Sequence, residues 1–258
     1  MHVDISAGQG TNSGFYPSAV IDHVSRKLLV VTRHSANKEK PSLYRCNLDG
    51  TNCTFTDISA GQLANTPALS LFSVVIDHVN GKLLAVTSNG ANNEKPSLFR
   101  CNLDGTSCSH TDISAGQGTN SGLGPNALID RINGKLLVVT SNGANSSKPG
   151  LFRCNLDGTG CSHTDISVGQ GNLSGSNPSA LIDHINGKLL VISRNAANQS
   201  KLSLFRCNLD GTSCSHTDIS AGQGEVSDLR MILDPINGKF IVTSRNSSNN
   251  GKPSLFIW

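Results

Sequence analysis

Glutamine, asparagine and lysine recur at matching positions of five similar units along this 258-residue chain. The glutamine set is Gln9, Gln62, Gln117, Gln170 and Gln223. The asparagine set is Asn37, Asn92, Asn145, Asn198 and Asn249. The lysine set is Lys40, Lys95, Lys148, Lys201 and Lys252. Amides and an ammonium group could bind a polar ligand such as a sugar, and five sites would add avidity. Alternatively, the amides stabilise loops by bonding the backbone, and the lysines are solvated surface charges.

Aspartate also recurs once in every unit. The aspartate set is Asp22, Asp77, Asp130, Asp183 and Asp234. Five carboxylates could bind calcium or act in catalysis. Each one, however, lies where a strand meets a turn, and the next residue varies among His23, His78, Arg131, His184 and Pro235. A carboxylate that caps a turn explains this pattern better, because the aspartate stays while its neighbour changes.

Four histidines fall on the strand that we expect to be outermost in each unit. They are His2, His110, His163 and His216, with Phe55 at the fifth equivalent position. Since one member is phenylalanine, packing at the sheet edge is favoured over metal ligation.

Catalysis usually needs one asymmetric constellation, whereas near-identical repeats supply five copies of everything. The sequence has no Ser-His-Asp signature, phosphate-binding loop or metal-ligand cluster. We therefore expect no catalytic residue, no cofactor and no metal, and predict that the protein is not an enzyme. Two segments break the repeat, residues 63–72 and 225–230. A single unique pocket, if there is one, is expected there, with Asp228 and Arg230 as its unusual charges.

These residues must be positioned by the repeat itself. The phrase Asp-Ile-Ser begins near residues 4, 57, 112, 165 and 218, a period of roughly 53 residues. In the fourth unit the expected strands are residues 180–182, 189–193, 204–208 and 215–220. Asn186-Gly187 and Asp210-Gly211 form tight turns, because such pairs accept positive φ. Four strands per unit predict an all-β, five-bladed β-propeller of four-stranded antiparallel blades, one domain over residues 1–258.

We expect the two ends of the chain to share one unit. Residues 254–258 stop within the third strand of the fifth unit, where Trp258 replaces a cysteine of the other copies. Residues 2–6 match residues 216–220, the fourth strand of the preceding unit. We therefore expect the N-terminal strand to complete the last blade, which closes the ring and removes its open edge.

Eight cysteines form four pairs, each separated by six residues. The pairs are Cys46/Cys53, Cys101/Cys108, Cys154/Cys161 and Cys207/Cys214. If the hairpin between them has a four-residue loop, the two cysteines face each other at a closely spaced pair that suits a disulfide. Zinc is disfavoured because its cysteine pairs normally have two to four intervening residues. Disulfides predict an oxidising compartment: secreted, periplasmic or at the cell surface.

Several phrases of the unit carry a resemblance. They are the apolar-Asp end of one strand (Leu181-Ile182-Asp183), the turn at Asn186-Gly187-Lys188, and the run Leu204-Phe205-Arg206 followed by Asn208-Leu209-Asp210-Gly211. These resemble blades of NHL and YWTD propellers. The resemblance implies extracellular recognition and no catalytic residue. The chain departs from those families in lacking the YWTD phrase and in having five units where they usually have six.

Composition excludes other classes. The net charge is only +3, which gives no nucleic-acid footprint. No apolar run approaches the length of a membrane span. The sequence therefore predicts a secreted or surface multivalent binding module, lectin-like and carbohydrate-binding through repeated long loops on one face. Alternatives are a protein-interaction or structural module of a larger surface protein, and an enzyme with one pocket at a divergent blade. Expected partners are glycans or a protein, and the chain is expected to be a monomer.

Overall fold

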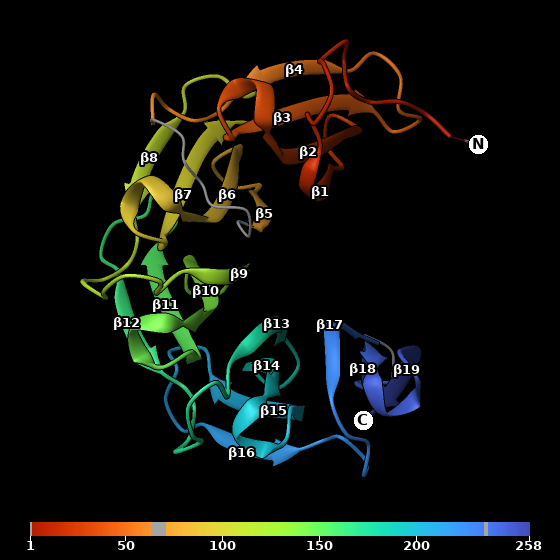
Figure 1. The fold of residues 1–258 in the computed structure, drawn as a ribbon. Helices are drawn as coiled ribbons and strands as arrows, with labels where there is room; N and C mark the ends of the chain where they lie inside the picture. The colour runs from red at the N-terminus through yellow and green to blue at the C-terminus, as the bar shows by residue number, and fades with distance from the viewer. Residues whose placement is uncertain (1, 63–70, 235–236) are drawn as a thin grey trace.

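The computed structural model describes residues 2–62, 71–234 and 237–258. Its strands form five antiparallel sheets that follow one another around a central axis (Figure 1). The first two blades are β1 (Phe15–Asp22), β2 (Lys27–His34), β3 (Lys40–Asn47) and β4 (Thr54–Asp57), then β5 (Phe72–Asp77), β6 (Lys82–Asn89), β7 (Lys95–Asn102) and β8 (Ser109–Asp112). The next two are β9 (Leu123–Asp130), β10 (Lys135–Asn142), β11 (Lys148–Asn155) and β12 (Ser162–Asp165), then β13 (Ser176–Asp183), β14 (Lys188–Asn195), β15 (Lys201–Asn208) and β16 (Ser215–Asp218). The last is β17 (Val226–Leu233), β18 (Phe240–Asn246) and β19 (Lys252–Ile257). The predicted fold class, an all-β five-bladed propeller, is confirmed.

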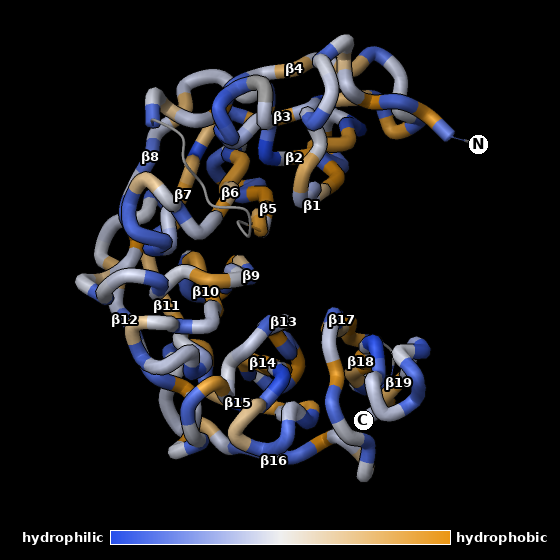
Figure 2. Tube along the Cα trace, in the orientation of Figure 1, coloured by the Kyte–Doolittle hydropathy of each residue, from blue (hydrophilic) through white to orange (hydrophobic). Residues whose placement is uncertain are grey.

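Alternating apolar residues hold the blades together. Leu29 and Leu43 of the first blade are buried against Leu83 and Phe99 of the second. Equivalent residues of later blades repeat this contact, so each of the first four sheets buries one face against the sheet that follows it. Figure 2 shows hydrophobic residues concentrated on the strands and hydrophilic ones on the connecting loops. The period-two pattern of the strands therefore builds the core between blades.

The two ends of each blade differ in their connections. Tight turns join β1 to β2 and β3 to β4 at one end, which we call the hairpin face. At the other end, the long-loop face, a 3-10 turn links β2 to β3 and a longer segment leads to the next blade. The five 3-10 turns are η1 (Ser35–Asn37), η2 (Gly90–Asn92), η3 (Gly143–Asn145), η4 (Ala196–Asn198) and η5 (Ser247–Asn249). None of the helices among the described residues is long or apolar enough to cross a membrane.

The aspartate set caps the first turn of each blade, as the sequence predicts. Asp77 Oδ1 accepts hydrogen bonds from the backbone N–H of Val79 and Asn80 at 3.1 and 3.2 Å. Its Oδ2 accepts from Asn80 Nδ2 at 2.7 Å. Gly81 follows with φ +61°, a left-handed conformation that glycine adopts without strain. The carboxylate is thus bound within the turn.

The four predicted disulfides are present: Cys46–Cys53, Cys101–Cys108, Cys154–Cys161 and Cys207–Cys214. Each joins the third and fourth strands of a blade across the Asp-Gly turn, with Cα atoms 4.0 to 4.1 Å apart. Such short separations belong to the closely spaced pairs of an antiparallel ladder. Four disulfides indicate that the chain folds in an oxidising compartment.

The closing strand predicted for the last blade is not paired in the structure. Among the described residues, the fifth sheet consists of β17, β18 and β19, and residues 2–6 have no strand assignment. Pairing would require the first and last blades to meet, and an opening separates them (Figure 1). Residues 2–6 instead lie along the first blade, where Val3 contacts Gly50.

Candidate functional site at the long-loop mouth

The central axis opens on the long-loop face into a cavity of about 590 Å³, which we call the long-loop mouth. The first residues of the inner strands of all five blades line it. They include Tyr16, Phe72, Gly124, Asn177 and Asp228. Five strand starts therefore converge on one space, although they are far apart in the sequence.

A β-bulge shapes this mouth in four blades. The pairing of inner and second strands shifts register between Phe15 and Ser18 in the first blade, and at the equivalent place in the third, fourth and fifth. The bulge residues are Tyr16, Gly124, Asn177 and Asp228, with φ between +50° and +57°. Asparagine and aspartate tolerate this left-handed conformation, whereas it is strained for Tyr16, and such strain is often found at functional sites. Bulges also redirect side chains next to active sites.

The bulge residues break the symmetry of the repeat. Tyrosine, glycine, asparagine and aspartate occupy equivalent positions, so the mouth presents a phenol, a gap, an amide and a carboxylate. Two residues further on, most blades have serine or asparagine, whereas the fifth has Arg230. Asn126 Oδ1 at this position accepts from the Ala180 N–H of the next blade at 3.3 Å. Arg230 instead brings a guanidinium group to the mouth.

Asp228 and Arg230 are the charged residues among those that line the cavity. Both side chains are exposed. Asp228 Oδ2 accepts a hydrogen bond from Ser227 Oγ at 3.0 Å, and Arg230 Nη1 donates to the Leu229 carbonyl at 2.9 Å. Of the divergent segment 225–230, where the sequence favours a unique pocket if there is one, residues 228–230 line this cavity. The other divergent segment, residues 63–72, lies outside the described residues except for Leu71 and Phe72, which line the same cavity.

Tyr16 belongs to an aromatic and charged group of the first blade. The guanidinium carbon of Arg33 lies 5.0 Å from the ring centroid of Phe15 and 5.1 Å from that of Tyr16. Arg33 Nε also forms an ion pair with Glu39 at 2.7 Å. Cation–π contacts of this kind fix aromatic rings in place. Of this group, Tyr16 lines the mouth.

Two further carboxylates lie in the loops beside the mouth. Glu39 and Glu94 occupy the position after the 3-10 turn that Ser147 occupies in the third blade. Ser147 lines a smaller hollow that shares Tyr16 and Asn177 with the mouth. Glu94 Oε2 accepts from Ser88 Oγ at 2.6 Å. The loops of the first two blades therefore carry acidic groups where later blades have serine or glycine.

The asparagine and lysine sets lie at the outer part of the same face. Asn37, Asn92, Asn145 and Asn198 each donate to the aspartate that ends the outer strand of their blade, at 2.8 to 3.0 Å. Lys40 Nζ lies 3.8 Å from Asp57 Oδ2. Burial raises the pKa of Asp57, but hydrogen bonds from Asn37 and Ser59 outweigh it and hold that pKa below its ordinary value. These amides have partners within the protein, and their role in ligand binding stays a prediction.

The glutamine set has a similar internal role in three blades. Gln117, Gln170 and Gln223 accept through Oε1 from Asn142, Asn195 and Asn246, at 3.0 to 3.1 Å. These glutamines are therefore hydrogen-bonded to the last residue of the second strand of their blade. The structure does not bring the glutamine, asparagine and lysine sets together into one pocket.

His110, His163 and His216 pack at the sheet edge as the sequence predicts, whereas His2, expected on the same strand, is exposed in a segment without strand assignment. The ring of His163 lies 4.8 Å from that of Phe152, and its Nε2 is 3.0 Å from Asn142 Nδ2. Phe55 makes the corresponding contact with Tyr44 at 5.5 Å. Within the described part of the chain, no group of three or more His, Cys, Asp or Glu side chains is arranged to hold a metal ion.

Sequence reasoning missed Tyr16, Gly124 and Asn177. Each comes directly before a proline that is the third residue of an inner strand, at Pro17, Pro125 and Pro178. A signal was present: this is a position where near-identical units carry different residues. The left-handed conformation of the residue at this position is set by the β-bulge, and no local sequence motif predicts that bulge.

Comparison with solved structures finds this fold in carbohydrate hydrolases. The endo-arabinase of Bacteroides thetaiotaomicron superposes with a TM-score of 0.51 at 13% identity, covering 99% of this chain and 95% of that one. RS223 β-xylosidase gives 0.53 at 11% identity, over 96% and 92% of the two chains. A GH43 β-xylosidase/α-arabinofuranosidase from a compost metagenome gives 0.52 at 12%, over 96% and 91%. No protein-family model and no curated protein matches the sequence.

These neighbours contradict the prediction that the protein is not an enzyme. That prediction rested on the premise that five near-copies of a blade cannot form one asymmetric constellation. Proteins named as glycosidases share the fold, and the bulge residues of this chain differ from blade to blade. At these identities the similarity shows the fold, a five-bladed propeller of the kind that those hydrolases have.

Proposed function

We propose that this protein is carbohydrate-active, and that it holds a glycan in the long-loop mouth and cleaves a glycosidic bond there. The observation that carries the proposal is the asymmetry of the mouth. One carboxylate, Asp228, and one guanidinium, Arg230, share a cavity with Tyr16 and Asn177. A phenol, an amide and opposite charges are groups that hold hydroxyl-rich ligands.

Cleavage of a glycosidic bond would give each charged side chain at or near the mouth a separate role. Cleavage of a glycosidic bond uses two carboxylic groups, one as acid and the other as base or nucleophile. Asp228 is the candidate at the mouth, where its exposed carboxylate accepts a hydrogen bond from the Ser227 hydroxyl. Glu39 or Glu94 in the adjoining loops would supply the second. Arg230 would orient the ligand.

The named activities of the structural neighbours support this class of ligand. They are described as an arabinase, a β-xylosidase and a β-xylosidase/α-arabinofuranosidase, the last one in complex with xylotriose. The four disulfides support export, to the cell surface or to the surrounding medium. The resemblance of the blade phrases to NHL and YWTD propellers, which stays a prediction, would imply extracellular recognition as well.

A second candidate is a multivalent, lectin-like binder. One observation favours it: the arrangement of asparagine, lysine and aspartate at the blade edge repeats in four blades, with the Asn–Asp bond exposed each time. Such a site would bind its ligand through the Asn–Asp pair without breaking the hydrogen bond between the two side chains. It would give several weak sites of equal strength, whereas the mouth gives a single one.

The test is a screen of the oxidised protein against polysaccharides, including arabinan, xylan and galactan, with release of reducing ends as the readout. The proposal expects hydrolysis of one polysaccharide class, lost in Asp228→Asn. No release of reducing ends from any polysaccharide would contradict it. Glycan binding at several equal sites without hydrolysis would contradict it in favour of the multivalent binder.

A further inference from the structure

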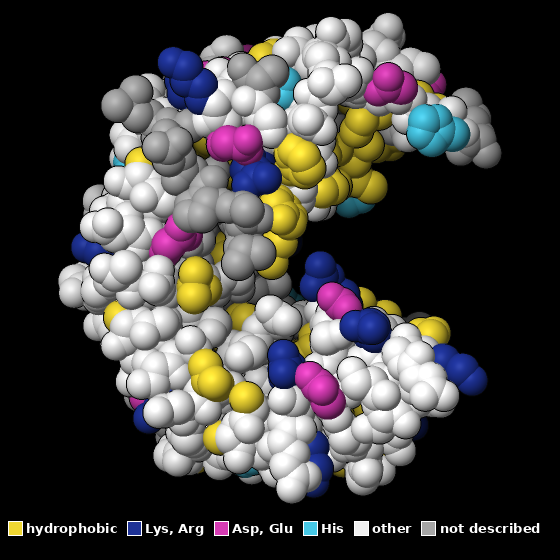
Figure 3. Space-filling model, in the orientation of Figure 1, with side chains coloured by type: hydrophobic (Ala, Val, Ile, Leu, Met, Phe, Trp, Pro, Cys, Tyr) yellow, Lys and Arg dark blue, Asp and Glu magenta, His cyan; other side chains and the backbone are white. Residues whose placement is uncertain are grey.

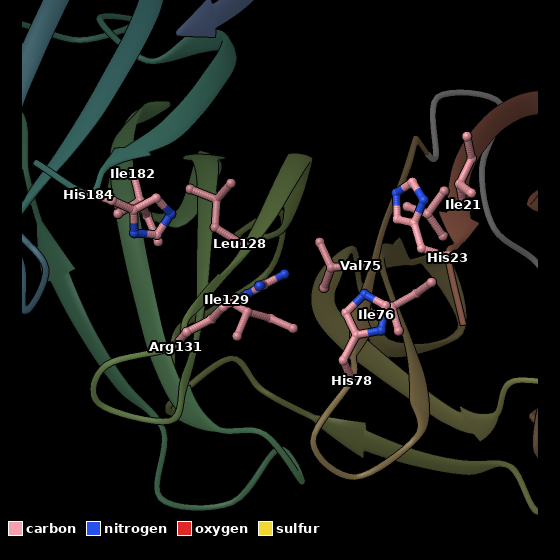
Figure 4. Close-up of a pocket in the computed structure, with 11 residues that line it drawn as sticks. Ile21, His23, Val75, Ile76, His78, Leu128, Ile129, Arg131, Ile182 and His184 are labelled. Atoms are coloured by element: carbon pink, nitrogen blue, oxygen red, sulfur yellow. The ribbon is translucent and has the colours of Figure 1, made fainter. Parts of the chain in front are cut away.

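A second cavity opens at the opposite end of the central axis, on the hairpin face. Its volume is about 720 Å³, and we call it the hairpin mouth. His23, His78, Arg131 and His184 line it, together with aliphatic residues of the inner strands (Figure 4). The four polar side chains come from four successive blades and are exposed. Four blades thus bring nitrogen-bearing groups to one opening.

The carboxylates of the aspartates that precede these residues are hydrogen-bonded within their turns. Asp130 Oδ1 accepts from the backbone N–H of Ile132 and Asn133, both at 3.1 Å, and its Oδ2 accepts from Asn133 Nδ2 at 2.6 Å. Asp130 is 1% exposed. The same turn bonds bury Asp77 and Asp183. The rim therefore presents imidazole and guanidinium groups to solvent, while the carboxylates face the turns.

Each of those aspartates also has a lysine opposite it in the same hairpin, although the ammonium group itself binds an asparagine of the third strand, as Lys135 Nζ binds Asn155 Oδ1 at 2.6 Å. Asp130 is the cross-strand partner of Lys135, and Asp22 of Lys27. Among the described residues that line the hairpin mouth, Arg131 is the one with a permanent positive charge.

The walls of the hairpin mouth are aliphatic. Val75, Leu128 and Ile129 lie between the polar side chains in Figure 4. A cavity with apolar walls and a few polar groups at its rim is the usual form of a small-ligand site. Here every described polar group that lines it can donate a hydrogen bond, and one is a guanidinium, whose fork fits a carboxylate or sulfonate.

We propose that the hairpin mouth binds a small organic anion. Its acidic group would be held by Arg131 and by the imidazole N–H groups of His78 and His184. Its apolar part would lie against Val75 and Leu128. This site is separate from the long-loop mouth and does not depend on the function proposed for it.

The test is calorimetric titration of the full oxidised chain with benzoate, benzyl alcohol and inorganic sulfate. Benzoate carries both an apolar ring and an acidic group, whereas each of the others has one of the two. The proposal expects saturable binding of benzoate and at least about tenfold weaker binding of the other two.

Two variants locate the site. Arg131→Ala should weaken benzoate binding at least about tenfold, because it removes the charged donor. Arg26→Gly is the matched control: it removes a cation from the same face but from outside the cavity, and the equivalent residues of the other blades are glycine. Asp228→Asn, at the other mouth, should also leave the affinity unchanged. Thermal unfolding of each variant verifies that it is folded.

Three results would overturn the proposal. They are the absence of saturable benzoate binding, equal binding of benzyl alcohol, and unchanged benzoate affinity in folded Arg131→Ala. Failure here would leave the polysaccharide test of the long-loop mouth unaffected, since the two experiments use different ligands and different variants.

Discussion

Val3 packs on Gly50: its Cγ1 atom lies 2.9 Å from the point that a β-carbon on Gly50 would occupy. Thr56 meets Gly105 of the next blade in the same way, at 2.9 Å. Thr111 and Thr164 repeat this contact with Gly158 and Gly211, at 3.0 Å. Val3 therefore holds, against the first blade, the place that an outer-strand residue holds against the blade that follows it.

If Val3 occupies the place of an outer-strand residue, the first blade should follow the last blade in the ring, but the two blades do not meet. Leu255 is 59% exposed, whereas its equivalent Leu43 is 1% exposed. Phe15 and Ile21 of the first blade are also exposed, and Figure 3 shows hydrophobic side chains on that blade where it borders the opening. Apolar surface on both sides of one gap favours closure.

We expect the ring to close in solution, with residues 2–6 pairing with β19. By analogy with the pair Phe205 and His216, closure places His2 opposite Phe256. The double variant His2→Cys, Phe256→Cys should then form a disulfide within one chain, detected by peptide mapping under dilute conditions. Phe205→Cys, His216→Cys is the positive control. A crosslink that forms between chains, or none at all, would contradict closure.

Glycine substitutions test the same closure by a different route. A β-carbon on Gly175 would lie 2.3 Å from the Pro149 nitrogen, whereas nothing lies within 4 Å of one on the equivalent Gly14. Gly175→Ala should therefore cost about 1–3 kcal/mol in the free energy of unfolding. If Lys252 and Pro253 of the last blade meet Gly14 in the closed ring, Gly14→Ala should cost about as much. Urea unfolding measures both, and a neutral Gly14→Ala would speak against a closed ring.

The disulfides should stabilise their blades separately. Replacing Cys101 and Cys108 by serine opens a loop of about eight residues and should lower the free energy of unfolding by about 2.5 kcal/mol. The equivalent change at Cys154 and Cys161 should have a similar effect, and the two should add because they lie in different blades. Denaturant titration checks this, and an effect near zero at both sites would show that the bridges do not constrain the unfolded chain.

Stability should fall as the solution becomes mildly acidic. Burial lowers the pKa of His110, His163 and His216, and the aspartate two residues on raises it only partly. The unfolded chain therefore takes up these protons first as the pH falls. Stability is fully present above the ordinary histidine pKa, about 6.5, and declines as the pH falls through it toward the lowered values.

Urea midpoints measured from about pH 8 down to about pH 5 test this window. His163→Phe, which matches Phe55 of the first blade, should reduce the dependence on pH. Aspartates whose pKa is lowered, such as Asp104 through its bonds from Thr106, act in a separate window below their ordinary pKa. An unchanged midpoint between neutral and mildly acidic solution would refute the role of the histidines.

The sequence predicts the features of the fold that depend on residues close together in the chain. Asn186-Gly187 and Cys207/Cys214 specify their hairpin within a few residues, and five such units predict the blades. That Asp228 and Tyr16 line one cavity could not be predicted, because it depends on how strand starts from distant parts of the chain converge. The bulge that orients them is also a matter of pairing between strands, which no single phrase encodes.

The hydrogen-bond partners of the repeated asparagine and glutamine residues could not be predicted from the sequence either. Asn92 lies twenty positions before Asp112, and only the pairing of β7 with β8 brings their side chains to 2.8 Å. Recurrence in five copies is expected of a residue that holds a loop as much as of one that binds a ligand. The asymmetric positions of the repeat are therefore the more informative ones.

The most direct test of the central claim is the turnover of wild type and Asp228→Asn on the polysaccharide that the screen identifies. Asp4→Asn, which removes an exposed carboxylate away from the mouth, is the control. The account predicts that Asp228→Asn loses at least about a hundredfold in kcat while the oligosaccharide Kd stays within a few-fold. Full activity of Asp228→Asn, with Asp4→Asn unchanged, would contradict it.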